Sequence, residues 1–153
     1  MKIYFATDHA GFELKNELLE YVSSELGFEV VDEGAHEYNK NDDYPDFMHK
    51  AARAVSENPE NRRAIILGGS GQGEAMVANR YKNVRAVVYY GGESSIITLS
   101  REHNNANVLS LGARFITVEE ARQAVASWLS QQFTADERHV RRIQKIENYQ
   151  ITN

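Results

Sequence analysis

The 153-residue chain has no cysteine, only two prolines and no long apolar run. Without a thiol it can form no disulfide, no cysteine-ligated zinc site and no cysteine nucleophile. This composition fits a reducing compartment, and we expect a cytoplasmic protein. No stretch approaches the roughly 20 apolar residues of a membrane span, and the first residues, MKIYFATDHA, lack the apolar segment of a signal peptide. The sequence therefore predicts no membrane partner.

Positive charge is also scarce. The chain has 17 Lys and Arg residues against 22 Asp and Glu residues, for a net charge of -5. Because nucleic-acid-binding domains normally carry a basic surface, we expect no nucleic-acid partner. Three arginines nevertheless fall within residues 138–142. Arg138 and Arg142 share one helix face, and two guanidinium groups there suit a phosphate. The alternative is a solvated face paired with Glu137 and Glu147.

Short apolar runs alternate with segments of helical spacing along the whole chain. The runs that predict strands are 2–6, 28–32, 64–69, 84–90 and 107–112. The segments that predict helices are 12–26, 45–56, a helix from about residue 73, 94–102, 117–132 and 136–149. This alternation predicts an α/β fold, a Rossmann-like three-layer doubly wound structure with a five-stranded parallel sheet. We expect a single domain over residues 1–153.

In such a sheet a ligand binds beyond the carboxyl ends of the strands, where the strand order reverses. The common strand order 2-1-3-4-5 places that point between the first and third strands. These strands are followed by TDHAG and GGSGQGE. We therefore expect the two loops to face each other across one crevice.

The second of these loops, GGSGQGE, matches neither the dinucleotide fingerprint G-x-G-x-x-G nor the P-loop, which needs a lysine. Its glycines allow backbone N–H groups to converge at a helix N-terminus, which predicts an anion hole. A tight turn is the alternative. Glu74, at the end of the loop, would be stabilised by the helix dipole by about 0.3–1 kcal/mol without any catalytic role. Beside an anion hole it could instead move a proton next to a carbonyl, giving an enediolate.

Two of the five histidines are candidates for the site. His9 falls at the expected crevice, and His103 lies in a polar run before the last strand. His36, His49 and His139 are assigned structural or solvated roles. Since no H-x-x-x-H pair, dense carboxylate set or thiolate occurs, we expect no metal and no cofactor.

Five motifs, taken together, resemble one family. They are TDHAGFELK, DDYPD, GGSGQGEAMVANR, LSREHNNANVLSLGAR and ERHVRRI, in this order over about residues 1–149. The chain resembles the type B ribose-5-phosphate isomerases and their galactose-6-phosphate isomerase relatives. The resemblance implies a homodimer or tetramer in which each active site takes residues from both subunits, with the helix at 136–149 reaching a partner subunit. It also implies metal-free aldose–ketose isomerisation of a sugar phosphate through a cis-enediolate.

The resemblance also implies roles for individual residues. The catalytic set is Glu74, Ser70, His103 and Asp8. The substrate-binding set is His9, Tyr44, Gly69, Gly71, Gly73, Asn104, Arg114, Arg138 and Arg142. Within these sets, Glu74 would be the base and Ser70 part of the anion hole. His103 would assist ring opening, and the three arginines would bind phosphate.

The chain departs from the family pattern in two places. Many members carry a catalytic cysteine where this chain has Gly68, and another branch uses a glutamate that Glu74 matches. The segment 89–98 is slightly longer than usual in the family, so the number of carbon atoms in the sugar substrate is left undecided. The leading expectation is ribose 5-phosphate to ribulose 5-phosphate. The alternatives are allose or galactose 6-phosphate, or a non-catalytic sugar-phosphate-binding domain, although a binder has no use for a base.

Overall fold

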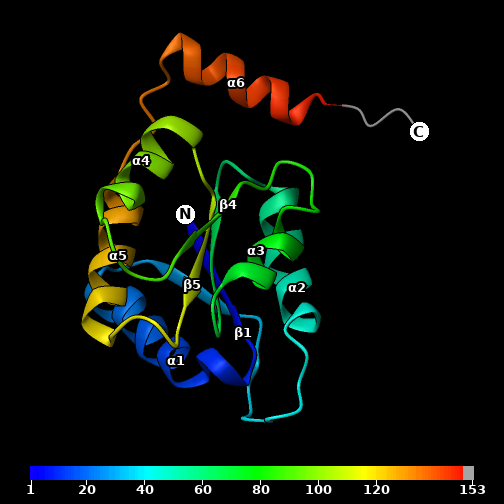
Figure 1. Cartoon of the computed structure of the whole chain (residues 1–153), viewed down its shortest axis with the longest axis vertical. Helices are drawn as coiled ribbons and strands as arrows, with labels where there is room; N and C mark the ends of the chain where they lie inside the picture. Colours follow the sequence, from blue (N-terminus) through cyan, green and yellow to red (C-terminus); the bar gives the residue numbers. More distant parts are fainter. Residues whose placement is uncertain (150–153) are drawn as a thin grey trace.

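The computed structural model describes residues 1–149, which form a five-stranded parallel sheet between two layers of helices (Figure 1). The strands are β1 (Lys2–Thr7), β2 (Glu29–Asp32), β3 (Arg62–Gly68), β4 (Ala86–Tyr89) and β5 (Val108–Gly112). The helices are α1 (Phe12–Glu20), α2 (Pro45–Glu57), α3 (Gln72–Ala78), α4 (Ser95–Asn104), α5 (Val118–Ser130) and α6 (Glu137–Glu147). The predicted three-layer α/β fold is confirmed.

Each face of the sheet has its own apolar core. Phe5, Leu67 and Trp128 belong to the cluster on the side of α1, α4 and α5. Met48 and Ile66 belong to the cluster on the side of α2 and α3. Neighbouring residues of β3 thus enter opposite cores, because successive side chains of a strand point to opposite faces. This two-sided burial explains why the strands read as continuous apolar runs.

The strand order is β2-β1-β3-β5-β4, so the predicted order 2-1-3-4-5 is wrong for its last two strands. β5 pairs with β3 and is buried throughout, whereas β4 is the edge strand and is only partly buried. The reversal between β1 and β3 is unaffected. One consequence is that the loop after β5 lies beside the loop after β3, where Ala113 N–H donates to Gly68 O at 2.9 Å.

Local signals in the sequence set several helix ends. Thr117 Oγ1 accepts a hydrogen bond from the Glu120 N–H, and the Glu120 carboxylate accepts one from the Thr117 N–H. This is the capping box that TVEE predicts at the start of α5. Pro45 opens α2, and Gly27 has the positive φ of 74° that suits a glycine after a helix. Among residues 1–149, no helix combines the length and apolar character needed to cross a bilayer.

The last helix, α6, lies at the end of the sheet where the strands begin, beside α4 (Figure 1). Glu147 near its end forms an ion pair with Arg85, which directly precedes β4. Ile146 and the first residue of β4, Ala86, line the same small cavity. α6 is therefore anchored at the opposite end of the sheet from the glycine loop.

Candidate active site

A cavity of about 480 Å³ opens where β1 and β3 end. Its walls come from the loops after β1, β3 and β5 and from the residue before α2. The lining residues are Asp8, His9, Ala10, Tyr44, Gly69, Ser70, Gly73, Glu74, Arg114 and Phe115. All of them except Ala10 and Phe115 are residues that the sequence predicts for the site. The two loops expected to face each other thus share one cavity.

The glycine loop needs glycine for two different reasons. Gly71 has a φ of 77°, in the left-handed region, and a Cβ there would lie 3.0 Å from the carbonyl carbon of Leu111 in β5. Its carbonyl accepts a hydrogen bond from Ser110 Oγ at 2.6 Å. At Gly73 the reason is close approach, because a Cβ there would lie 2.6 Å from the hydroxyl oxygen of Tyr44. The loop is therefore held against β5 on one side and Tyr44 on the other.

Glu74 is buried, with 4% of its surface exposed, and its carboxylate lies against Gly68. A Cβ at Gly68 would lie 1.7 Å from Glu74 Oε1. The carboxylate therefore occupies the space that any side chain at position 68 would need. A cysteine at that position and a glutamate carboxylate in this place exclude each other sterically, which gives the departure at Gly68 a physical reason.

Burial raises the pKa of the Glu74 carboxyl, and the negative charge of Asp8 raises it further. The backbone N–H of Glu74 itself acts in the opposite direction. A carboxylate with a raised pKa is a stronger base than an exposed one. The site therefore holds a carboxylate suited to taking up a proton.

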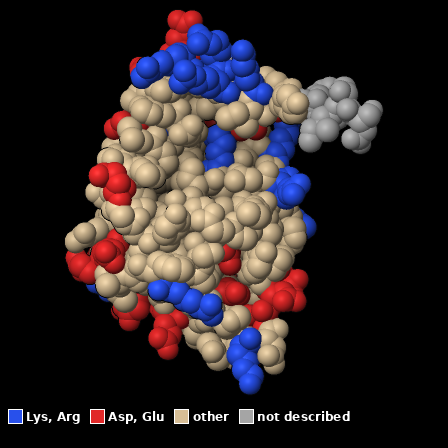
Figure 2. All heavy atoms as spheres, viewed as in Figure 1, with Lys and Arg blue, Asp and Glu red and all other residues tan. Residues whose placement is uncertain are grey.

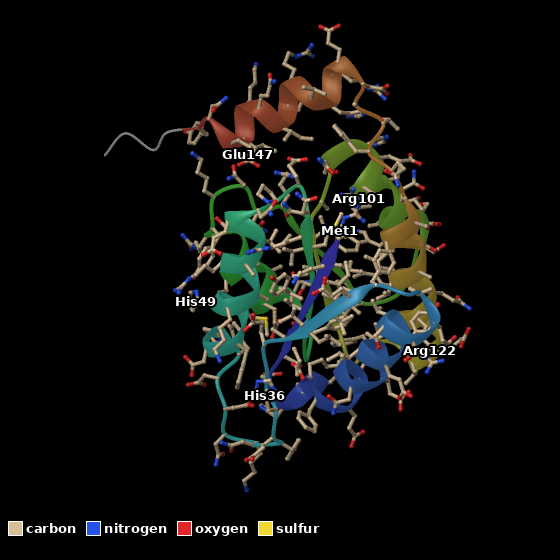
Figure 3. All side chains as sticks on the ribbon, turned by 180° about the vertical axis from the view of Figure 1, so that it is seen from behind. Met1, His36, His49, Arg101, Arg122 and Glu147 are labelled. Carbon is tan, nitrogen blue, oxygen red and sulfur yellow. The ribbon has the colours of Figure 1, made fainter. Side chains whose placement is uncertain are left out.

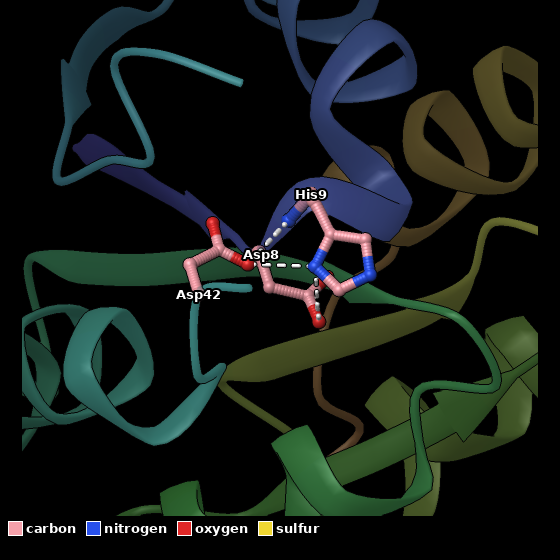
Figure 4. Close-up of side chains that lie close together, drawn as sticks. All are labelled: Asp8, His9 and Asp42. Atoms are coloured by element: carbon pink, nitrogen blue, oxygen red, sulfur yellow. Dashed lines mark hydrogen bonds and ion pairs between the residues drawn. The ribbon is translucent and has the colours of Figure 1, made fainter. Parts of the chain in front are cut away.

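Asp42 positions His9, as Figure 4 shows. Asp42 Oδ1 lies 2.7 Å from His9 Nδ1 and also accepts the His9 backbone N–H at 3.1 Å. Since an ionised carboxylate can only accept, Nδ1 carries the proton and Nε2 is the free ring nitrogen. The sequence does not single out Asp42, because DDYPD contains several carboxylates and nothing local tells them apart. Asp8 lies alongside and caps the turn after β1 by accepting the Ala10 N–H at 2.9 Å.

Asp8, His9 and Asp42 also offer ligand atoms within 4.8 Å of one another, close enough to hold a metal ion. The hydrogen bond between His9 and Asp42 already joins two of these atoms, so a cation would have to displace the proton that they share. Residues 33 positions apart in the chain form no metal motif, which is why the sequence does not show this cluster. Metal-free chemistry stays a prediction.

Four of the predicted site residues lie elsewhere in the chain's fold. α4 runs back from the carboxyl end of β4 to the amino end of β5, so His103 and Asn104 in its last turn lie at the amino ends of the strands. The helix thus continues past its predicted end at residue 102 and includes the first residues of the polar run, ending at Asn104. Arg138 and Arg142 belong to α6, where Figure 2 shows basic side chains gathered. Within one chain, these four residues do not meet Glu74.

These four residues have their own surroundings. The His103 ring stacks on that of His139, with centroids 4.3 Å apart and an interplanar angle of 14°. Burial lowers the pKa of His139, and the neighbouring His103 and Arg138 lower it further. Arg138 Nε donates to His139 Nε2 at 3.3 Å. His139, 3% exposed, therefore packs against His103 in surroundings that disfavour its charged form.

The anticipated pairing of the α6 arginines with Glu147 does not occur, since that carboxylate bonds to Arg85. Over residues 1–149, Arg138 and Arg142 form no ion pair with any carboxylate. Their guanidinium groups are exposed on α6. They are therefore available to an anion.

The sequence matches the family model described as Ribose/Galactose Isomerase over residues 3–146. The chain belongs to the ribose/galactose isomerase family. Within this family it is 37% identical to ribose-5-phosphate isomerase B of Mycolicibacterium paratuberculosis, over all of this chain and 94% of that protein. It is also 37% identical to ribose-5-phosphate isomerase B of Escherichia coli, over 95% of this chain and 93% of that protein.

Solved structures of the ribose/galactose isomerase family agree with this assignment. Ribose-5-phosphate isomerase B of Mycoplasma genitalium, solved with bound ribulose-5-phosphate, superposes with a TM-score of 0.91 at 38% identity. That match covers 97% of this chain and 95% of the other. The Thermotoga maritima enzyme superposes with a TM-score of 0.87 at 38% identity, covering 97% and 98% of the two chains. The fold of this family member is therefore shared over nearly its whole length.

Proposed function

We propose that the chain is an aldose–ketose isomerase that interconverts ribose 5-phosphate and ribulose 5-phosphate. The curated relatives carry this activity in their names, and the M. genitalium structure holds ribulose-5-phosphate. The observation within this chain that carries the proposal is the buried carboxylate of Glu74, held beside the glycine loop in the shared cavity. A protein that only binds sugar phosphates would gain nothing from burying a carboxylate there.

In the proposed reaction, Glu74 takes the proton from C2 of the open-chain aldose. The electrons of the C–H bond form the C1=C2 double bond, and the negative charge moves to the C1 oxygen of a cis-enediolate. Ser70 and the N–H groups of the first turn of α3, which have no intrahelical acceptors, stabilise this charge. Protonation of C1 by Glu74 and transfer of the O2 proton to O1 then give the ketose. These steps need neither a metal nor a cofactor.

We further propose that the active site is shared between two copies in a homodimer. The support is the distribution of residues in one chain, where the base lies at one end of the sheet and His103, Asn104, Arg138 and Arg142 lie at the other. A second copy would bring its own set of these four residues to the cavity of the first. His103 with Asn104 would then assist ring opening, and the arginines would join Arg114 at the phosphate.

Subunit mixing tests the shared site. Glu74→Gln should be nearly inactive, and Arg138→Ala should be nearly inactive when ribose 5-phosphate is kept well below the raised KM of this variant. A hybrid dimer of the two has one site with both residues intact and one with neither. With random exchange, half of the dimers are hybrid, so the mixture should regain about a quarter of wild-type activity. No recovery after proven subunit exchange would place the whole site in one chain.

Substrate choice is tested with ribose 5-phosphate, allose 6-phosphate and galactose 6-phosphate. Tyr90 lies edge-on to Phe115, with ring centroids 6.1 Å apart, and Phe115 lines the cavity. This contact joins the longer 89–98 segment to the substrate pocket and favours the six-carbon sugars as the second candidate. We expect the highest kcat/KM with ribose 5-phosphate, unchanged by EDTA. Binding of these sugars without turnover would reject the isomerase. The cytoplasmic location stays a prediction.

A further inference from the structure

A second polar cavity lies at the amino ends of the strands, at the other end of the sheet from the catalytic pocket. It measures about 320 Å³, and Arg63, Arg101, Asn105 and Asn107 are among its lining residues. Arg63 is the second residue of β3, whose last residue is followed by the glycine loop. At about 3.3 Å per residue, the two ends of β3 are roughly 20 Å apart. Within one chain, this cavity and the catalytic cavity therefore lie at opposite ends of β3.

Both arginines of this cavity are buried. Arg63 is 8% exposed and Arg101 is 4% exposed. Their guanidinium carbons lie 5.5 Å and 5.8 Å from the ring centroid of Trp128, so both cations contact the same indole. Such cation–π contacts offset part of the desolvation of a buried charge. They do not neutralise it.

The hydrogen-bond partners of the two guanidinium groups are all uncharged. Arg63 Nη1 donates to Leu129 O at 3.2 Å, and Arg101 Nη1 donates to Asn105 Oδ1 at 2.8 Å and to Ala106 O. Arg101 Nε donates to Gln131 O at 3.4 Å.

Three guanidinium nitrogens remain, namely Arg63 Nε, Arg63 Nη2 and Arg101 Nη2. None has an acceptor among residues 1–149, and none is sealed from solvent. These nitrogens can donate to a ligand in the cavity.

Among residues 1–149, no carboxylate forms an ion pair with Arg63 or Arg101. The nearest acidic neighbour in sequence, Glu102, accepts a hydrogen bond from the Gln131 amide at 2.9 Å instead. Glu60 lines the cavity but is exposed and forms no ion pair with described residues. Burial, together with the positive charges of Arg63 and Arg85, lowers the pKa of Arg101 to about 10. Two buried like charges without a counter-ion are unfavourable unless an anion joins them.

We propose that Arg63 and Arg101 form a second anion site, which binds the dianion of inorganic phosphate or of a small phosphate monoester. Two guanidinium groups balance the two charges of a phosphate, and the planar forks of arginine suit its oxygens. The volume of the cavity leaves room for a small organic group beside the phosphate. The proposal does not depend on the isomerase activity, because it uses none of the residues of the catalytic cavity.

Trp128 provides a local readout, because it is the chain's single tryptophan and touches both guanidinium groups. Figure 3 shows Arg101 and Met1, which also lines the cavity, at the end of the sheet below α6. Inorganic phosphate should be titrated at constant ionic strength, with chloride as the balancing anion, while Trp128 emission is recorded. We expect a saturable change in emission that chloride does not produce.

The variants assign this response to the cavity. Arg63→Met keeps an unbranched side chain against Trp128 and loses one backbone hydrogen bond, so it should fold. It should bind phosphate on the order of 10- to 100-fold more weakly, as expected for lost charge-assisted hydrogen bonds. Arg142 belongs to α6 and does not line this cavity, so Arg142→Ala should show the same phosphate-dependent change in Trp128 emission as the wild type. Glu60→Gln removes the only carboxylate among the described lining residues and should bind phosphate a few-fold more tightly.

Two results would overturn the proposal. One is the absence of a saturable Trp128 response at tens of millimolar phosphate. The other is equal affinity in the wild type and in folded Arg63→Met, as judged by circular dichroism. If Arg63→Met does not fold, the Glu60→Gln comparison decides, because an unchanged affinity there shows that phosphate binds away from this cavity.

Discussion

Replacing Gly68 with alanine should remove most of the turnover while the protein stays folded. The new Cβ would lie 1.7 Å from Glu74 Oε1, whereas ordinary van der Waals contact begins at 3.4 Å. The carboxylate must therefore move away from position 68 by about 1.7 Å. A misplacement of about 1 Å in a reacting group lowers the rate by about 10²-fold. Gly68 does not have a positive φ, so its backbone accepts alanine. We therefore expect kcat for ribose 5-phosphate to fall by about 10²-fold or more.

A second substitution tests whether the clash is the cause. Aspartate is shorter than glutamate by one bond, about 1.5 Å. Glu74→Asp alone should be impaired because its carboxylate falls short of the substrate. In Gly68→Ala/Glu74→Asp the shorter carboxylate avoids the methyl group, so the double variant should be more active than the product of the two single effects. Thermal unfolding of each variant controls for stability. If Gly68→Ala kept kcat within about twofold of the wild type, the steric account of Glu74 would be wrong.

Three further predictions concern pH, phosphate binding and His9. Because burial raises the pKa of Glu74, kcat/KM should fall on acidification at a higher pH than for an exposed glutamate. Glu74 also stays protonated to a higher pH in the folded protein than in the unfolded chain. The free energy of unfolding should therefore decrease as the pH rises from the ordinary pKa of a glutamate to the raised pKa. Denaturant titrations should show this decrease in the wild type and not in Glu74→Gln. Arg142→Ala should raise KM by about 10- to 150-fold with little change in kcat, whereas Arg141→Ala, off that face, should leave KM within about twofold. Asp42→Asn removes the carboxylate that fixes the His9 tautomer and should lower kcat/KM by about tenfold, with Asp43→Asn as the unaffected control.

The sequence predicts the fold well because burial on both faces of the sheet leaves a direct trace. In β3, Leu67 and Ile66 are buried in the two opposite cores, so both faces of the strand need apolar residues and the sequence reads as the apolar run AIILGG. The order of the last two strands leaves no such trace. Both β4 and β5 read as short apolar runs, and only their different burial in the folded chain distinguishes the edge strand from the central one.

The site is predictable where it depends on chain topology. The carboxyl ends of β1 and β3 must lie side by side if the order reverses there, so Asp8 and Glu74 can be placed in one crevice from the sequence. Asp42 cannot be placed in this crevice from the sequence, because it lies in the loop between β2 and α2, which has no regular structure to predict its position beside His9. The steric role of Gly68 is also hidden, since the sequence does not show where the Glu74 carboxylate lies.

Solvent deuterium exchange with ribose 5-phosphate tests the central claim, that Glu74 moves the proton between C2 and C1, most directly. In D₂O the wild type should incorporate solvent deuterium at C2 of the aldose as it interconverts the two sugars. Glu74→Gln keeps the shape of the side chain and removes the base, so exchange and turnover should fall together by roughly 10²–10⁴-fold while the dissociation constant for ribose 5-phosphate is retained. Exchange of the C2 proton by Glu74→Gln at the wild-type rate would contradict the account.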